Sequence, residues 1–144
     1  MKISESTAIW RGSLKEGEGK IQFNSIDYEV TFNYETRFGN EKGMSPEELI
    51  GAALAGCFSM ALADILTKEG HSPTEIKTSA HVITEMTEHA FRIAEIQLST
   101  VAKIDNIDES VFLKFAEDTM ENCPVSRALE AVDISLKAKL INIK

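Results

Sequence analysis

The strongest constraint on the fold of this chain is an uninterrupted apolar run, LIGAALAGCFSMALA, which extends from Leu49 to Ala63. The segment SPEE at 45–48 precedes the run and is typical of a helix start, because its serine can cap the helix and its proline fits the first helical position. We therefore predict a helix from Ser45 to about Lys68. A helix that is apolar on all sides has to be surrounded by protein, and the small residues of this one permit close approach by another element.

Size and charge limit the possible functions. The chain has 144 residues, of which 43% are hydrophobic, and a formal net charge of −8. These values are typical of a globular protein, and we expect residues 1–144 to form a single domain. The acidic balance argues against nucleic acid as a partner, because binding to phosphates depends on Lys and Arg. The apolar run is shorter than the ~20 residues of a membrane span, and the N-terminal segment has no apolar signal region. We expect a cytoplasmic protein that does not bind membranes.

Alternation of apolar and polar residues predicts the remaining elements. The expected strands are 3–11, 20–24, 28–34, 76–88, 91–104 and 134–143, with a loop at 35–44 and a hairpin turn near His89. A second helix is expected from a cap at Asp108 to Cys123, where Pro124 ends it. Its predicted inner stripe is Val111, Phe112, Phe115, Ala116 and Thr119, and one short helical turn is expected at 126–131. This order predicts an α+β fold with mostly antiparallel sheet.

The chain has only two cysteines, and they stand in different settings. Cys57 lies inside the apolar run, whereas Cys123 is followed by a proline. Without a secretory signal, two cysteines favour reduced or redox-active thiols over a structural disulfide. The residues alone leave blander interpretations open. Cys57 can be a small buried hydrophobic residue, and Cys123 can be a helix-end residue of no special chemistry.

Four motifs together resemble the OsmC/Ohr family of thiol-dependent hydroperoxide reductases. They are TRFGNEKG at 36–43, SPEELIGAALAGCFSMAL at 45–62, CPVS at 123–126 and DISLKAKL at 133–140. The first motif is closer to the osmotically inducible branch than to the organic hydroperoxide resistance branch. The resemblance implies an OsmC-like intertwined homodimer with a long buried central helix and two sites at the subunit interface. It also implies a Cys-based peroxidase whose substrates are organic hydroperoxides, with hydrogen peroxide as a further candidate.

The resemblance further implies roles for four residues. Cys57 is expected to be the peroxidatic thiol, and Cys123 is expected to resolve its sulfenic acid as an intramolecular disulfide. Arg37 and Glu47 are expected to be the activating pair. An external dithiol, of the lipoyl type in at least one branch, is the expected reductant, and no metal or bound cofactor is required. Arg11 is a weaker rival for the activating role.

Elementary chemistry is consistent with these roles. A thiolate rather than a thiol cleaves a peroxide bond, and an apolar helix raises the pKa of a thiol. A nearby cation therefore has to lower the pKa of Cys57, and a guanidinium remains charged while a carboxylate orients it. Glu47 and Cys57 are ten residues apart on the predicted helix, which is about 15 Å along its axis. We therefore expect Arg37 and Glu47 to act in trans, on Cys57 of a second chain.

Two other functions remain compatible with the residues. The same dimer can bind a small apolar ligand without peroxidase activity, with the cysteines serving only in packing. A redox-sensing protein that changes a partner surface is a third interpretation, but the sequence contains no disordered segment to carry such a change. The three histidines, at 71, 81 and 89, are scattered and are not expected to be catalytic.

Overall fold

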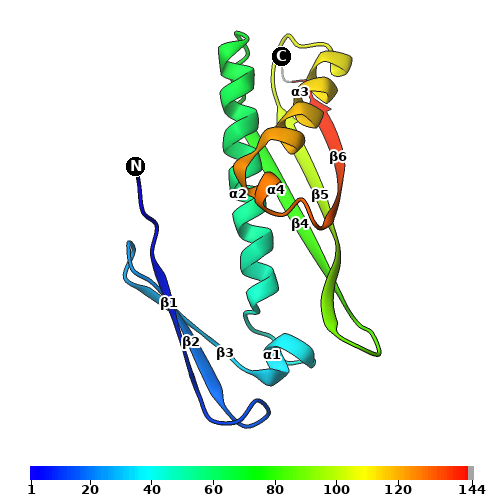
Figure 1. The fold of residues 1–144 in the computed structure, drawn as a ribbon. Helices are drawn as coiled ribbons and strands as arrows, with labels where there is room; N and C mark the ends of the chain where they lie inside the picture. The colour runs from blue at the N-terminus through cyan, green and yellow to red at the C-terminus, as the bar shows by residue number, and fades with distance from the viewer. Residues whose placement is uncertain (143–144) are drawn as a thin grey trace. The chain divides into compact units, whose positions relative to one another are not determined.

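A computed structural model of the chain describes residues 1–142, and Figure 1 shows the order of its elements. The chain divides into two compact units, an N-terminal unit of residues 1–49 and a C-terminal unit that begins at Ile50. Strands and helices occur in both units, which confirms the α+β class.

The N-terminal unit contains a three-stranded antiparallel sheet in the order β1-β2-β3. Its strands are β1 (Ser6–Arg11), β2 (Glu18–Phe23) and β3 (Tyr28–Phe32). Gly19 of β2 pairs with Trp10 on one side and with Phe32 on the other. A Cβ atom at Gly19 would lie 2.6–2.7 Å from both aromatic rings. Glycine therefore allows the two rings to approach each other across β2, and their centroids are 5.6 Å apart.

The predicted loop at 35–44 is wrong in its first half, where the chain forms the short helix α1 (Tyr34–Phe38). A reciprocal capping box starts this helix. Asn33 Oδ1 accepts the Thr36 amide N–H at 2.9 Å, and Thr36 Oγ1 accepts the Asn33 amide N–H at 2.9 Å. The usual box has Glu or Gln at the position that Thr36 occupies. Because Thr36 stands at this position, the sequence does not show the usual capping pattern, and the helix was not predicted.

The C-terminal unit contains a mixed three-stranded sheet in the order β4-β5-β6. The predicted long hairpin is confirmed, with β4 (Glu75–Met86) antiparallel to β5 (Phe91–Lys103). The predicted last strand is also confirmed as β6 (Asp133–Ile141), which runs parallel to β5. The end of that predicted strand, Ile143, lies outside the described residues.

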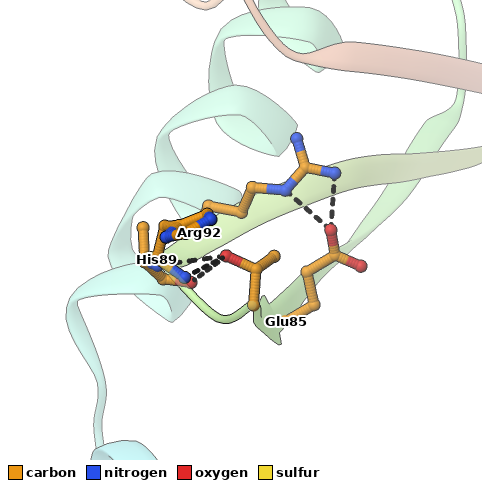
Figure 2. A network of polar contacts seen from close by, with 5 residues as sticks. Glu85, His89 and Arg92 are labelled. Atoms are coloured by element: carbon orange, nitrogen blue, oxygen red, sulfur yellow. Dashed lines mark hydrogen bonds and ion pairs between the residues drawn. The ribbon is translucent and has the colours of Figure 1, made fainter.

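Polar contacts close the tip of the β4–β5 hairpin (Figure 2). Thr87 Oγ1 accepts the amide N–H of Ala90 at 3.0 Å and that of His89 at 3.3 Å. Arg92 Nε donates to Oε1 of Glu85, its direct cross-strand partner, at 2.6 Å. His89 contributes its backbone to this turn, which is a structural role.

The central helix α2 (Pro46–Lys68) confirms the helix predicted around the apolar run. Ser45 Oγ accepts the Glu48 amide N–H at 3.2 Å at its start, and Gly70, with φ +86°, follows its end. A Cβ atom at Gly51 would lie 3.1 Å from Cγ2 of Val82, so glycine here allows α2 to approach β4 closely. The fully buried residues of the helix follow the i, i+4 spacing of one face: Leu54, Phe58, Leu62 and Leu66.

The opposite face of α2 is exposed within one chain. Ala52, Gly56 and Met60 lie on it, four residues apart, and Met60 is 77% exposed. By length and composition alone α2 could cross a membrane, with a mean hydropathy of 2.0. The completely buried stripe of Leu and Phe is also typical of the core helix of a globular protein. Within one chain, protein thus covers one side of this helix, whereas the sequence predicted that protein would cover all sides.

Two further helices complete the core against α2 and the sheet (Figure 1). α3 (Glu109–Asn122) confirms the second predicted helix, and α4 (Pro124–Ala128) starts two residues before the predicted turn at 126–131. Phe112, Ala116 and Thr119 of α3 are buried as predicted. Val111 is 40% exposed, because it points about 100° away from its neighbour Phe112 on the helix. Asp108 occupies the cap position, but its side chain makes no capping hydrogen bond.

Candidate functional site

The two cysteines, 66 residues apart in sequence, meet inside the C-terminal unit. The Sγ atom of Cys123 lies 2.9 Å from the Sγ atom of Cys57, and both are free thiols. Cys57 is half-buried on α2, whereas Cys123 is 1% exposed. A disulfide bond has a sulfur–sulfur length of about 2.05 Å. Only a small movement therefore separates this dithiol from a disulfide.

Cys123 is held at the junction between α3 and α4. Its amide N–H donates to Thr119 O at 2.8 Å, and its carbonyl accepts the Arg127 amide N–H at 3.0 Å. Cys123 is therefore both the C-cap residue of α3 and the N-cap residue of α4. Pro124 has no amide hydrogen and cannot continue α3. The proline thus fixes the turn in which the Cys123 sulfur meets Cys57.

The environment of Cys57 favours its protonated form. Burial is the largest influence and raises the pKa of the Cys57 thiol. The hydrogen bond with Cys123 and the charge of that second sulfur also raise this pKa, while the backbone of Val125 acts in the opposite direction. Within the C-terminal unit, Cys57 by itself is therefore a poor nucleophile near neutral pH.

The environment of Cys123 favours its anion. Burial is again the largest influence and opposes ionisation, but the hydrogen bonds to this sulfur together outweigh it and lower the pKa of Cys123. The groups that favour the anion are the Cys57 thiol, the Ser126 amide and hydroxyl, and the Val125 amide, all of which can donate to this sulfur once it is charged. Of the two sulfurs, Cys123 is thus the one that loses its proton first when no cation acts on the pair.

The other two predicted site residues meet each other in the N-terminal unit. Arg37 of α1 donates to Oε1 of Glu47 from Nε at 3.0 Å and from Nη2 at 2.8 Å. Both of these donors reach the same carboxylate oxygen. Glu47 is only 8% exposed, so its charge needs a cationic partner. The Arg37 guanidinium also lies 5.0 Å from the centroid of the Phe38 ring, which further fixes its orientation.

A mainly apolar cavity of about 310 Å³ adjoins Arg37 in the N-terminal unit. Its lining residues are Trp10, Leu14, Phe32, Asn33, Tyr34, Arg37 and Phe38. The sequence pattern did not predict this cavity, since it gave the strands without the register that brings Trp10 next to Phe32. Conversely, no three His, Cys, Asp or Glu side chains of residues 1–142 gather in a geometry that could hold a metal ion.

The fold and the site define the class of this protein as an α+β protein with two adjacent free thiols. Residues 39–137 match the family described as OsmC-like protein. Over 135 residues the chain is 39% identical to peroxiredoxin OsmC of Escherichia coli, covering 91% of this chain and 94% of that protein. The chain therefore belongs to the OsmC-like family, as its motifs predicted.

Two more distant proteins extend the comparison. Organic hydroperoxide resistance protein-like 2 of Staphylococcus epidermidis is 27% identical over 96 residues, which is 64% of this chain and 65% of that protein. The crystal structure of an OsmC-like protein from Mycoplasma pneumoniae matches with a TM-score of 0.75 at 18% identity. That match covers 97% of this chain and 98% of the other, and shows a shared fold.

Proposed function

We propose that this protein is a thiol-dependent peroxidase that reduces organic hydroperoxides through Cys57 and Cys123. The proposal depends on one observation, the 2.9 Å approach of two reduced sulfurs in a chain that is 39% identical to a protein named peroxiredoxin. The name of the Staphylococcus epidermidis relative supports organic hydroperoxides as the substrate class. Residues 1–144 act in this proposal as a single OsmC-like domain.

The reaction proceeds in two steps on the protein. The Cys57 thiolate attacks the terminal peroxide oxygen, so that an S–O bond forms, the O–O bond breaks, and the leaving alkoxide takes a proton to become an alcohol. Cys57 is thereby oxidised by two electrons to a sulfenic acid. The Cys123 thiolate then attacks that sulfur; the S–S bond forms, and hydroxide leaves and becomes water. An external dithiol, for which a lipoyl-type group is our candidate, restores both thiols by exchange.

Arg37 is the proposed activating cation, and Glu47 is the carboxylate that orients it. Burial raises the pKa of Cys57, so the first step requires a positive charge that stabilises the thiolate. The guanidinium of Arg37 is already fixed on Glu47 before a substrate arrives. Such preorganised charge stabilises an anion without further reorganisation. Cys57 and Glu47 share the continuous helix α2 at a spacing of about 15 Å. We therefore propose that the pair acts in trans.

A homodimer follows from this arrangement, and the exposed face of α2 is the proposed contact. Ala52, Gly56 and Met60 form a stripe of small and flexible apolar side chains there. A Cβ atom at Gly56 meets nothing within 4 Å in the single chain. Gly56→Leu should therefore leave the chain folded and block close approach of a second α2. Light scattering should give a dimer for the wild type and a smaller species for this variant.

The apolar cavity beside Arg37 is the proposed binding place for the organic part of the substrate. Its volume of about 310 Å³ and its aromatic lining fit an alkyl or aryl group. Hydrogen peroxide has no such group and gains nothing from this cavity. We therefore propose a preference for organic hydroperoxides, and a cytoplasmic site of action, where thiols are kept reduced.

Thiol counting tests the proposed function directly. The reduced protein is mixed with one equivalent of cumene hydroperoxide, and the remaining free thiols are counted. We expect the loss of two thiols per chain, and no loss of this kind in Cys57→Ser. The Cys123→Ser variant should still react once and then stall as a sulfenic acid. Unchanged thiols in the wild type would rule out the peroxidase and favour a ligand-binding dimer, which should keep its ligand affinity in Cys57→Ala.

A further inference from the structure

The hydroxyl of Ser126 is a buried polar group without an obvious structural purpose. Ser126 is 6% exposed, and within residues 1–142 its Oγ atom has no hydrogen-bond partner of ordinary geometry. Buried polar side chains in native proteins are usually paired, and an unpaired one is destabilising. We therefore expect the Ser126 hydroxyl to gain a hydrogen-bond partner in another state of the protein.

The position of Ser126 identifies that partner as the sulfur of Cys123. Cys123 is the N-cap residue of α4, and Ser126 is the third residue of that helix, at position N3. A cap side chain and the third helical residue face each other at a helix start. As a thiol, the Cys123 side chain makes no capping hydrogen bond. A thiolate is a much stronger acceptor than a thiol, so ionisation of Cys123 supplies what the Ser126 hydroxyl lacks.

Among residues 1–142, no charged group stabilises the Cys123 anion in place of the Ser126 hydroxyl. The influences on the pKa of Cys123 come from burial, from Cys57, and from the polar groups of Val125 and Ser126. Cys57 is the only titratable group among them, and no Lys, Arg, Asp or Glu side chain of the described residues contributes. The anion on Cys123 therefore depends on uncharged donors, of which the Ser126 hydroxyl is the only one from a side chain other than Cys57.

We propose that Ser126 is a positioning residue for the resolving step, with its hydroxyl donating to the Cys123 thiolate beside Cys57. This inference rests on the proposed peroxidase function. The stabilised thiolate attacks the Cys57 sulfenic acid; the S–S bond forms, the S–O bond breaks, and the leaving hydroxide becomes water by taking up the proton that Cys123 released to the solvent when it ionised. When an external dithiol attacks the Cys57 sulfur of the disulfide, Cys123 leaves as a thiolate, and the same hydroxyl stabilises it.

The first test measures the ionisation of Cys123 without any peroxide. In a Cys57→Ser background, the ultraviolet absorbance of the single thiolate is followed against pH. Adding Ser126→Val should move this titration to higher pH, whereas adding Ser126→Thr, which keeps the hydroxyl and has the shape of valine, should leave it near that of the parent. Thr119→Val is the matched control, because the Thr119 hydroxyl is also buried but donates to Phe115 O within its own helix. It should not move the titration.

The second test measures the resolving step itself in the chain with both cysteines. After rapid mixing with cumene hydroperoxide, sulfenic acid is trapped at successive times. Losing one charge-assisted hydrogen bond lowers the thiolate fraction about tenfold, while the higher intrinsic nucleophilicity of the more basic sulfur offsets part of this loss. We therefore expect the sulfenic acid of Ser126→Val to persist about threefold longer, with the rate of its formation unchanged and with recovery in Ser126→Thr.

The outcomes separate this inference from the function on which it rests. Thermal melting first establishes that each variant is folded, and Ser126→Ala provides a second hydroxyl-free variant. An unchanged Cys123 titration in both hydroxyl-free variants would overturn the role of Ser126. An equal shift in Thr119→Val would also overturn it, because any buried hydroxyl would then have the same effect. A shift specific to Ser126 in a protein that consumes no hydroperoxide would support the contact and refute the peroxidase.

Discussion

The two units of the chain differ in what they bury. The C-terminal unit contains every hydrophobic side chain of the buried core, from Leu54 to Cys123. In the N-terminal unit every residue of β1 is exposed, and Glu47 is its only buried charged residue. The two thiols lie in the C-terminal unit, and the proposed activating charge lies in the N-terminal unit. The unit with the activating charge thus lacks an apolar core of its own, which is consistent with a need for a second chain.

The acid–base properties of the units differ in a complementary way. Hydrogen bonds from uncharged groups lower the pKa of Cys123, and burial raises that of Cys57. Alone, the C-terminal unit therefore favours a negative charge on Cys123, the proposed resolving sulfur, rather than on Cys57, the proposed attacking one. A guanidinium next to Cys57 would lower the pKa of that thiol and so act against this preference. If Arg37 comes from a second chain, assembly of the dimer is what makes Cys57 reactive.

The largest expected effect tests the difference in burial. Phe58→Ala removes a fully buried ring from the core and should lower the free energy of unfolding by about 3–5 kcal/mol. Trp10→Ala in the N-terminal unit should cost clearly less, because Trp10 is 37% exposed. Urea unfolding followed by circular dichroism gives both values. Equal losses would show that the N-terminal unit has as strong a core as the C-terminal unit.

The second prediction tests the activating charge. Arg37→Ala should slow the first thiol oxidation by roughly a hundredfold, because the Cys57 thiolate loses its cation. Arg37→Lys should lie between this variant and the wild type, since a lysine keeps the charge but not the planar fork. Stopped-flow measurement of sulfenic acid formation gives the rates.

Arg11→Ala is the control for this experiment, as Arg11 is the rival arginine and ends the exposed strand β1. It should react like the wild type. A large loss in Arg11→Ala together with normal rates in Arg37→Ala would transfer the activating role from Arg37 to Arg11.

The third prediction concerns the carboxylate that orients the guanidinium. Glu47→Gln keeps an oxygen acceptor for Arg37 but loses the charge, so the first step should slow by about tenfold. Glu48→Gln is the matched control, because Glu48 is exposed and contributes its amide N–H to the cap of α2. Comparable losses in both variants would indicate a general electrostatic effect of the helix start instead of a specific contact with Arg37.

Much of this arrangement could be predicted from the sequence, and the exceptions have physical causes. The capping segment and the unbroken apolar run predicted α2, and alternation of apolar and polar residues predicted the β4–β5 hairpin and β6, because each of these signals is long and continuous. These signals missed α1, whose cap uses Thr36, and the cavity beside Arg37, which depends on strand register. The resemblance of the motifs indicated that Cys57 and Cys123 form a pair. The order in which they ionise was not predictable, since it depends on donors that fold around them.

The smallest expected effect is on stability, and it has opposite signs for the two sulfurs. The pKa of Cys57 is raised in the folded state, so its contribution to stability is present at neutral pH and is lost as the pH rises through that raised pKa. The pKa of Cys123 is lowered, so its contribution is present above the unfolded-state pKa and is lost as the pH falls through the lowered one. In the single-thiol variants, burial still raises the pKa of Cys57, and the Ser126 and Val125 groups still favour the Cys123 anion. From neutral pH to about pH 10, Cys57→Ser should therefore gain stability relative to Cys123→Ser. Urea unfolding of both variants at the two ends of this range measures the difference. A change of the same sign and size in both variants would mean that the two sulfurs do not differ in acidity, and the division of roles between them would lose its electrostatic basis.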